Sequence, residues 1–142
     1  MIIRRANITD VFEVSRLWLN MVLEQDKTLT PDLEMWRGYI VGLMKSPAYF
    51  MFVAEHENRL AGFIDYCMNP EATIGAWIAI INFFYVVPEF RGEASGKLWE
   101  MAIESAKGNN AKYFSSICFT EKLEFWEKHG FVAEMLAIRR EL

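Results

Sequence analysis

The pattern of hydrophobic and polar residues in the first third of the chain predicts one short strand followed by two helices. Residues 2–5 form a run typical of a strand, and apolar residues then recur every three or four positions, the spacing of one helix face. Asp10 and Glu13 are expected to form a capping box that starts the first helix. Thr30 as the N-cap and Pro31 at the first helical position are expected to start the second.

Three β-rich runs occupy the middle of the chain. Residues 49–55 and 59–68 are separated by a polar turn at residues 56–58, which predicts an antiparallel hairpin. The third run, residues 74–87, is hydrophobic almost throughout and predicts a central strand covered on both faces. Pro88 is expected to end that strand.

The last third of the chain returns to alternating helices and strands. A helix is predicted over residues 95–107, before a Gly-Asn-Asn sequence suited to a C-terminal cap, and a strand over residues 112–119. A short helix over residues 120–129, closed by Gly130, is expected next. Residues 131–142 then predict a terminal strand.

This order of elements, β-α-α-β-β-β-α-β-α-β, predicts an α+β protein with a mixed central sheet flanked by helices. A right-handed crossover makes the strand before Pro88 and the strand at residues 113–119 parallel neighbours. The 142 residues contain no repeat or linker and are expected to form a single domain over residues 1–142.

Composition and charge narrow the class of partner. The net charge of −4 is the wrong sign for a nucleic-acid footprint and mildly favours a cationic or amine-bearing partner. Cys67 and Cys118 lack the spacing of a zinc or disulfide motif, so no metal site is indicated and reduced cytoplasm is the expected location. No segment is long and apolar enough to suggest a membrane span.

The stretch VVPEFRGEASGKLW, residues 86–99, carries the clearest chemistry. A strand ends, a basic loop with two glycines follows, and a helix begins; the free N–H groups and dipole of a helix N-terminus attract anions. Gly92 and Gly96 let the backbone approach a ligand, and Arg91 and Lys97 supply positive charge. The spacing fits neither the nucleoside-triphosphatase loop nor the dinucleotide-binding motif.

Together with FWEKHGF, residues 125–131, this stretch resembles the Gcn5-related N-acetyltransferase (GNAT) superfamily. The resemblance implies that acetyl-coenzyme A (acetyl-CoA) binds with its pyrophosphate on the backbone amides of residues 92–97. The pantetheine arm would pair with residues 84–86 where the two parallel strands splay apart, and the N–H of Val86 would polarise the thioester carbonyl. The cofactor-binding residues expected from the resemblance are Phe84, Tyr85, Val86, Arg91, Gly92, Glu93, Ala94, Ser95, Gly96, Lys97, Phe119 and Trp126.

Three positions depart from the family pattern. Ala94 occupies a glycine position, and a positive φ there would cost on the order of 1 kcal/mol. Phe119 replaces a frequent asparagine. Trp126 replaces the tyrosine that protonates the leaving thiolate in many members, and an indole N–H cannot give up a proton near neutral pH. Loss of a general acid would slow transfer by about a hundredfold or more.

The catalytic group is not identified by the sequence. Tyr85, Asn82 and Ser116 are polar candidates for ordering a water or donating to the thiolate. Trp18, Trp36 and Tyr39 are candidates for the wall of a substrate cleft, although their helical spacing suits a core equally. The acidic residues that could attract an amine fit better on a solvated face; they are Glu24, Asp26, Glu34 and Asp65.

These observations predict an acetyl-CoA-dependent N-acetyltransferase that acts by direct attack of a primary amine, on a small molecule or a peptide. The alternative is a catalytically weak or inactive GNAT fold that serves as a coenzyme A-binding or protein-interaction module. A third reading is a GNAT-like scaffold without cofactor. The strand after Gly130 leaves a sheet edge that a second subunit could cover, as in a homodimer.

Overall fold

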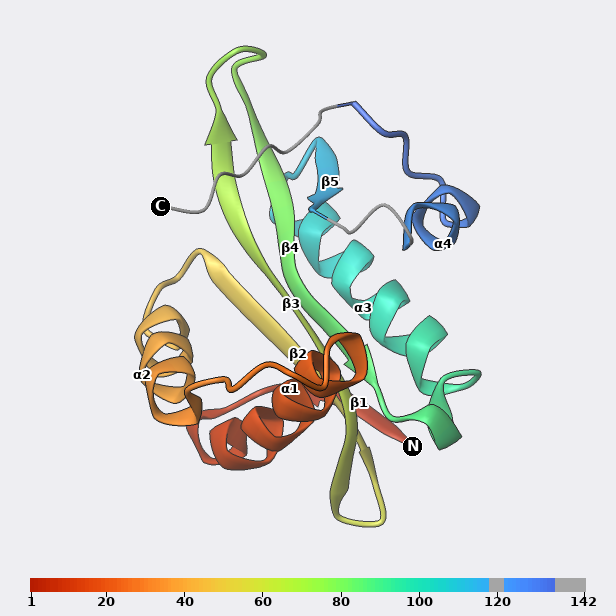
Figure 1. Ribbon diagram of the computed structural model, residues 1–142. Helices are drawn as coiled ribbons and strands as arrows, with labels where there is room; N and C mark the ends of the chain where they lie inside the picture. Colours follow the sequence, from red (N-terminus) through yellow and green to blue (C-terminus); the bar gives the residue numbers. More distant parts are fainter. Residues whose placement is uncertain (118–121, 135–142) are drawn as a thin grey trace.

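Within residues 1–117 and 122–134, the part of the chain that the computed structural model describes, five strands form one mixed sheet in the order β1-β2-β3-β4-β5 (Figure 1). The strands are β1 Ile2–Arg5, β2 Tyr49–His56, β3 Arg59–Glu71, β4 Ala76–Val86 and β5 Tyr113–Ser116. Neighbours are antiparallel from β1 to β4, whereas β5 runs parallel to β4. The predicted mixed sheet and its parallel pair are therefore confirmed.

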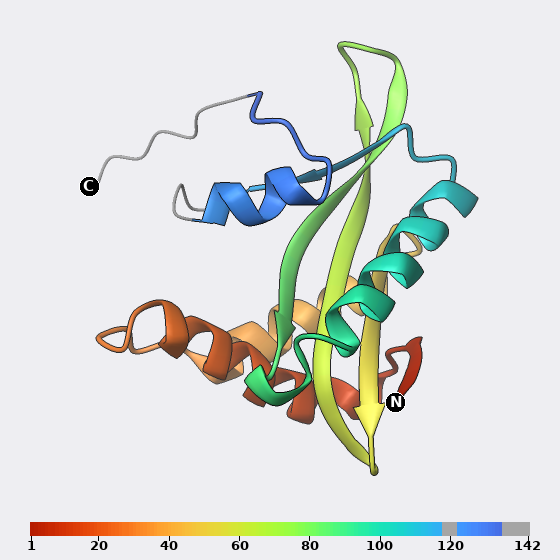
Figure 2. The ribbon, with the colours of Figure 1, turned by 90° about the vertical axis from the view of Figure 1, so that its right-hand side faces the viewer.

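Helices cover both faces of the sheet (Figures 1 and 2). One face carries α1 Val11–Gln25 and α2 Leu33–Met44, and the other carries α3 Ala94–Gly108 and the short α4 Leu123–Lys128. Short 3-10 turns, η1 Ile8–Asp10 and η2 Pro88–Phe90, precede α1 and α3. None of the described helices has the length and apolar character needed to cross a membrane.

The alternation of side chains along β3 divides the core into two layers. Ile64 and Tyr66 pack with α3, while Phe63 packs with α1 and α2. The strand that is buried on both faces along most of its length is thus β3. The strand predicted at residues 74–87 is β4, but it is not covered on both faces along its whole length. Trp77 is half exposed, and Gly75 lies in the preceding turn.

Two-residue turn chemistry explains the β2–β3 hairpin. Glu57 and Asn58 both have positive φ, 49° and 61°, as a two-residue hairpin turn requires for the twist of its strands. The hairpin predicted from the polar turn is confirmed, although His56 belongs to β2.

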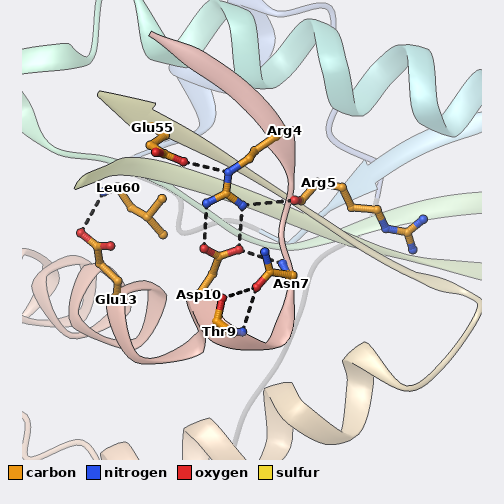
Figure 3. A network of polar contacts seen from close by, with 8 residues as sticks. All are labelled: Arg4, Arg5, Asn7, Thr9, Asp10, Glu13, Glu55 and Leu60. Atoms are coloured by element: carbon orange, nitrogen blue, oxygen red, sulfur yellow. Dashed lines mark hydrogen bonds and ion pairs between the residues drawn. The ribbon is translucent and has the colours of Figure 1, made fainter. Parts of the chain in front are cut away.

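The predicted starts of the first two helices are wrong. The capping box is formed by Asn7 and Asp10 around η1, while the Glu13 carboxylate accepts a 2.8 Å hydrogen bond from the backbone N–H of Leu60 (Figure 3). In α2 the cap is Asp32, whose carboxylate accepts from the N–H of Met35 at 2.9 Å. The observed N-cap Asn7 lies three residues before the expected Asp10, and the observed N-cap Asp32 lies two residues after the expected Thr30.

An ion-pair cluster around Arg4 anchors α1 to the sheet (Figure 3). The guanidinium of Arg4 donates to both carboxylate oxygens of Asp10 at 2.8 Å, and its Nε donates to Glu55 at 2.8 Å. The hydrogen bond from Arg4 lowers the pKa of Asp10, and the same contacts raise the pKa of Arg4. This cluster joins β1, β2 and the entry to α1, which fixes where the later residues of α1 lie.

The C-terminal elements match the expectations in part. Helix α3 extends one residue beyond each predicted end, and Gly130, with φ +85°, follows α4 as expected. Residues 131–134 form no strand. The rest of the predicted terminal strand, and the last two residues of the strand predicted at 112–119, lie outside the described residues.

Candidate functional site

A β-bulge lies in β4 where its described pairing with β5 ends. On the β3 side, Asp65 pairs with Phe83 and Tyr66 with Ile81, so Asn82 is an extra residue without a partner. A bulge bends its strand and increases the local twist. The parallel pairing with β5 ends at Ile81 and Ser116, immediately before the bulge, while β4 continues to Val86. Within the described residues the parallel pairing therefore ends at the bulge, as the predicted splay requires; residues 118–121, which follow on from β5, lie outside the described residues.

The carboxylate of Asp65 holds the bulge in place. It is fully buried and accepts hydrogen bonds from the N–H of Phe83 at 2.8 Å, the O–H of Tyr49 at 2.8 Å and the amide of Asn82 at 3.1 Å. Burial raises the pKa of Asp65 to about 7, although the three donors favour the ionised form. The expectation that Asp65 lies on a solvated face is wrong; the informative signal was an isolated acid inside an apolar strand.

Asp65→Asn is expected to change how stability depends on pH. The pKa of about 7 in the folded protein lies above the roughly 3.9 of an unfolded chain, so the folded state keeps a proton that the unfolded state has released. Wild-type stability therefore falls between about pH 4 and pH 7 through this group, and the variant lacks that loss. The free energy of unfolding of the variant minus that of the wild type should rise by up to about 4 kcal/mol over this range.

Urea denaturation of both proteins across this pH range measures the difference. The hydrogen bonds that the substitution alters shift the free energy of unfolding of the variant by the same amount at every pH. They therefore do not change how the difference between the two proteins varies with pH. A difference that is flat or falls with rising pH would contradict a buried, ionisable Asp65.

Beyond the bulge, β4 has no strand partner among the described residues on the side away from β3. The N–H of Val87 donates to the carbonyl of Ala61 at 2.8 Å, so residues at alternate positions from Val87 face β3. The N–H and C=O of Phe84 and Val86 consequently face away from β3, whereas those of Tyr85 face it. On that side, main-chain groups with no strand partner among the described residues could pair with an extended ligand.

The N-terminus of α3 is uncapped. Glu93 is its N-cap residue and makes no side-chain capping bond, so helical geometry leaves the first-turn N–H groups of residues 94–96 for another acceptor. An added Cβ at Gly92 or Gly96 would meet nothing within 4 Å. The protein itself does not require glycine at these two positions, and open space lies over them.

The predicted penalty at Ala94 is absent. Ala94 is not among the residues with positive φ, and its side chain is fully buried in the layer between α3 and the sheet. Alanine at this position is therefore compatible with the loop.

The two cations of the segment, Arg91 before α3 and Lys97 in its first turn, are both paired with carboxylates. Lys97 contacts Glu93 at 2.7 Å, and this hydrogen bond lowers the pKa of Glu93. Arg91 contacts Glu24 of α1 at 2.5 Å, and its Nε donates to the carbonyl of Val86 at 3.0 Å. Neither cation is without a counter-charge in this state.

Tyr85 lies on the α1 face of the sheet. Its hydroxyl donates to Glu24 at 2.6 Å, and burial, with Glu24 second, raises the pKa of Tyr85 to about 12, so the phenol stays protonated near neutral pH. Both residues line a groove of about 650 Å³ between α1 and the end of β4. The residues of this groove are Arg16, Asn20, Leu23, Glu24, Lys27, Tyr85, Val87, Pro88 and Glu89.

The three aromatic residues expected at a substrate cleft are not part of the groove. Trp36 is a core residue, stacked on Trp18 with ring centroids 4.9 Å apart and edge-on to Phe83. Tyr39 is half exposed on α2. The core alternative that the helical spacing left open is the better description of Trp36.

The remaining predicted residues fall in two places. Ser116 and Asn82 lie at the point where β4 and β5 part. Trp126 is half-buried in an aromatic cluster, with its ring centroid 5.7 Å from Trp99 and 5.1 Å from Phe131. Phe119 lies outside the described residues.

Residues 12–131 match the model of the acetyltransferase (GNAT) family. The chain therefore belongs to the GNAT acetyltransferase family, whose cosubstrate is acetyl-CoA. No curated protein matches it.

Solved structures of the same fold cover almost the whole chain. A transcriptional regulator from Bacillus halodurans C-125 is 21% identical over 99% of both chains, with a TM-score of 0.82. Glucosamine-6-phosphate N-acetyltransferase from Arabidopsis thaliana is 18% identical, covering 99% of this chain and 97% of that chain, with a TM-score of 0.77. A predicted acetyltransferase from Clostridium acetobutylicum, solved with acetyl-CoA, is 15% identical over 99% and 95%, with a TM-score of 0.81. At these identities the likeness shows the fold.

Proposed function

We propose that this protein binds acetyl-CoA and transfers its acetyl group to a primary amine. The observation that carries the proposal is the uncapped N-terminus of α3, with open space over Gly92 and Gly96, beside the part of β4 that continues past its described pairing with β5. Membership of the GNAT family and a similar structure solved with acetyl-CoA support it.

The chain's own groups fit the two polar parts of this cosubstrate. The first-turn N–H groups of residues 94–96 would hold the pyrophosphate, because a helix N-terminus favours anions. The outward-facing main chain of Phe84 and Val86 would pair with the amides of the pantetheine arm. When bound, acetyl-CoA supplies an acetyl thioester that an amine can attack.

The acceptor is proposed to be a small-molecule or peptide amine that enters from the α1 side, where the groove lies. Reaction by direct attack requires the neutral amine, with its proton passed to solvent or a weak base. Trp126 cannot serve as a general acid, so the residues act mainly by holding the two reactants together. The cytoplasm is the proposed location, and a second copy of the chain is the proposed partner for an open sheet edge.

A catalytically quiet coenzyme A-binding module is the second candidate, favoured by Trp126 and Phe119 in place of polar family residues. Thiol release from acetyl-CoA, measured over a panel of amines, peptides and polyamines, separates the two. Turnover with any acceptor eliminates the quiet module. Binding of acetyl-CoA without turnover across the panel eliminates the enzyme, and absence of binding at high micromolar concentration eliminates both.

A further inference from the structure

One carboxylate connects the loop before α3 with the groove beside α1. Glu24, near the end of α1, accepts the Tyr85 hydroxyl on one oxygen and a guanidinium N–H of Arg91 on the other, at 2.6 Å and 2.5 Å. Arg91 also donates from Nε to the carbonyl of Val86, and its guanidinium carbon lies 5.8 Å from the ring centroid of Tyr85. Two groups, the Tyr85 hydroxyl and the Arg91 guanidinium, thus meet at Glu24, and Arg91 links them to the carbonyl of Val86.

These contacts engage groups that the proposed cosubstrate needs. Arg91 directly precedes Gly92, so its charge is placed for the pyrophosphate, yet a carboxylate of the same protein neutralises it. The carbonyl of Val86 faces the splay, where a pantetheine amide would donate, and Arg91 Nε already donates to it. Acetyl-CoA therefore meets an arginine that must exchange partners.

The exchange is energetically accessible. The side chains of Arg91 and Glu24 are 49% and 44% exposed, and an ion pair this exposed contributes little. A pyrophosphate carries more negative charge than a carboxylate. Its oxygens can also accept two parallel N–H hydrogen bonds from one guanidinium.

Once Arg91 leaves, Glu24 is an ionised acid on the wall of the groove. With Arg91 in place, burial opposes ionisation, but the hydrogen bonds from Tyr85 and Arg91 outweigh it and lower the pKa of Glu24. After Arg91 leaves, the Tyr85 hydroxyl and the nearby charge of Lys122 still favour the carboxylate. The other charges of the groove are Glu89, Lys27 and Arg16, and Arg16 is already paired with Glu13 at 3.1 Å. A vacated Glu24 is then open to a positive charge on the acceptor, at a group other than the neutral amine that attacks the thioester.

We infer that Glu24 is a shared ionic partner, which holds Arg91 before acetyl-CoA binds and holds the cationic group of the acceptor afterwards. This inference rests on the proposed function. Because Arg91 and the acceptor compete for one carboxylate, a cation bound at Glu24 must favour acetyl-CoA, and acetyl-CoA must favour the cation by the same factor.

Calorimetric titration of acetyl-CoA into the wild type, Glu24→Gln and Glu89→Gln tests the first half. Both variants remove one negative charge from the same groove, but Glu89 forms no ion pair within the described residues. Glu24→Gln should bind about two- to fivefold more tightly than Glu89→Gln, with a smaller margin at high salt. Equal affinities, or weaker binding by Glu24→Gln, would overturn the inference.

The second half is tested with 1,4-diaminobutane as the cationic probe. Its presence should tighten acetyl-CoA binding to the wild type, relative to sodium chloride of equal ionic strength, and should not do so in Glu24→Gln. The same response in both proteins, or none in the wild type, would remove Glu24 from acceptor binding. A wild type that fails to bind acetyl-CoA at all would instead overturn the proposed function itself.

Discussion

Gly62→Ala is expected to destabilise the fold by about 3 kcal/mol or more, the upper end of the range for overpacked sites. Gly62 lies on β3 opposite Val86, in the closely spaced kind of antiparallel pair. An added Cβ would stand 2.7 Å from the carbonyl oxygen of Tyr85 and 2.8 Å from Cγ2 of Val86. Backbone atoms of β4 cannot retreat without separating β3 from β4, so chemical denaturation should show a lower midpoint for this variant.

Gly42→Ala in α2 is the matched control. A Cβ at that position meets nothing within 4 Å, and alanine is favoured over glycine in a helix by up to about 1 kcal/mol. The two substitutions should therefore change the free energy of unfolding in opposite directions. A Gly62→Ala variant within about 0.5 kcal/mol of the wild type would show that β3 and β4 are not this close, since that is the range of neutral surface changes.

Gly96→Glu is expected to weaken acetyl-CoA binding by about a hundredfold or more while leaving the protein folded. The new side chain would fill the open space over the first turn of α3. It would also place a negative charge beside the free N–H groups that are proposed to bind the pyrophosphate. Stability should be preserved because an acid in the first turn of a helix is favourable. Calorimetric titration measures the affinity, and thermal unfolding confirms the fold.

Gly38→Glu provides the same chemical change at another open position in a helix. It should leave the affinity for acetyl-CoA within about twofold of the wild type, because screening limits the effect of a distant surface charge. If both variants bind equally well, or both lose binding equally, the N-terminus of α3 does not hold the pyrophosphate.

Local turn chemistry explains which parts of the fold were predictable. Asn58 tolerates the positive φ that a two-residue hairpin turn requires, and Pro88 lies two residues after the end of β4 at Val86. A right-handed crossover then leaves one place for β5, beside β4. The segment at residues 91–97, which spans the start of α3, was recognisable because its glycines and cations lie close together in the sequence.

The unpredicted features depend on contacts between distant residues. Asp65 and Asn82 meet only when β3 and β4 pair, and nothing in either strand alone marks the bulge. Arg91 and Glu24 meet because α1 packs on the sheet beside the end of β4. The helix caps were misassigned for another reason: several residues able to cap lie close together, and tertiary contacts such as that of Glu13 with Leu60 select among them.

Amide NMR of the 15N-labelled protein during titration with acetyl-CoA tests the central claim most directly. The largest shifts are predicted for the backbone amides of Ala94, Ser95 and Gly96, with further shifts at Phe84 and Val86, because these N–H groups are the proposed ligands. Shifts confined to other parts of the chain, or none at saturating acetyl-CoA, would contradict the assignment of the uncapped helix and the splayed strand as the cosubstrate site.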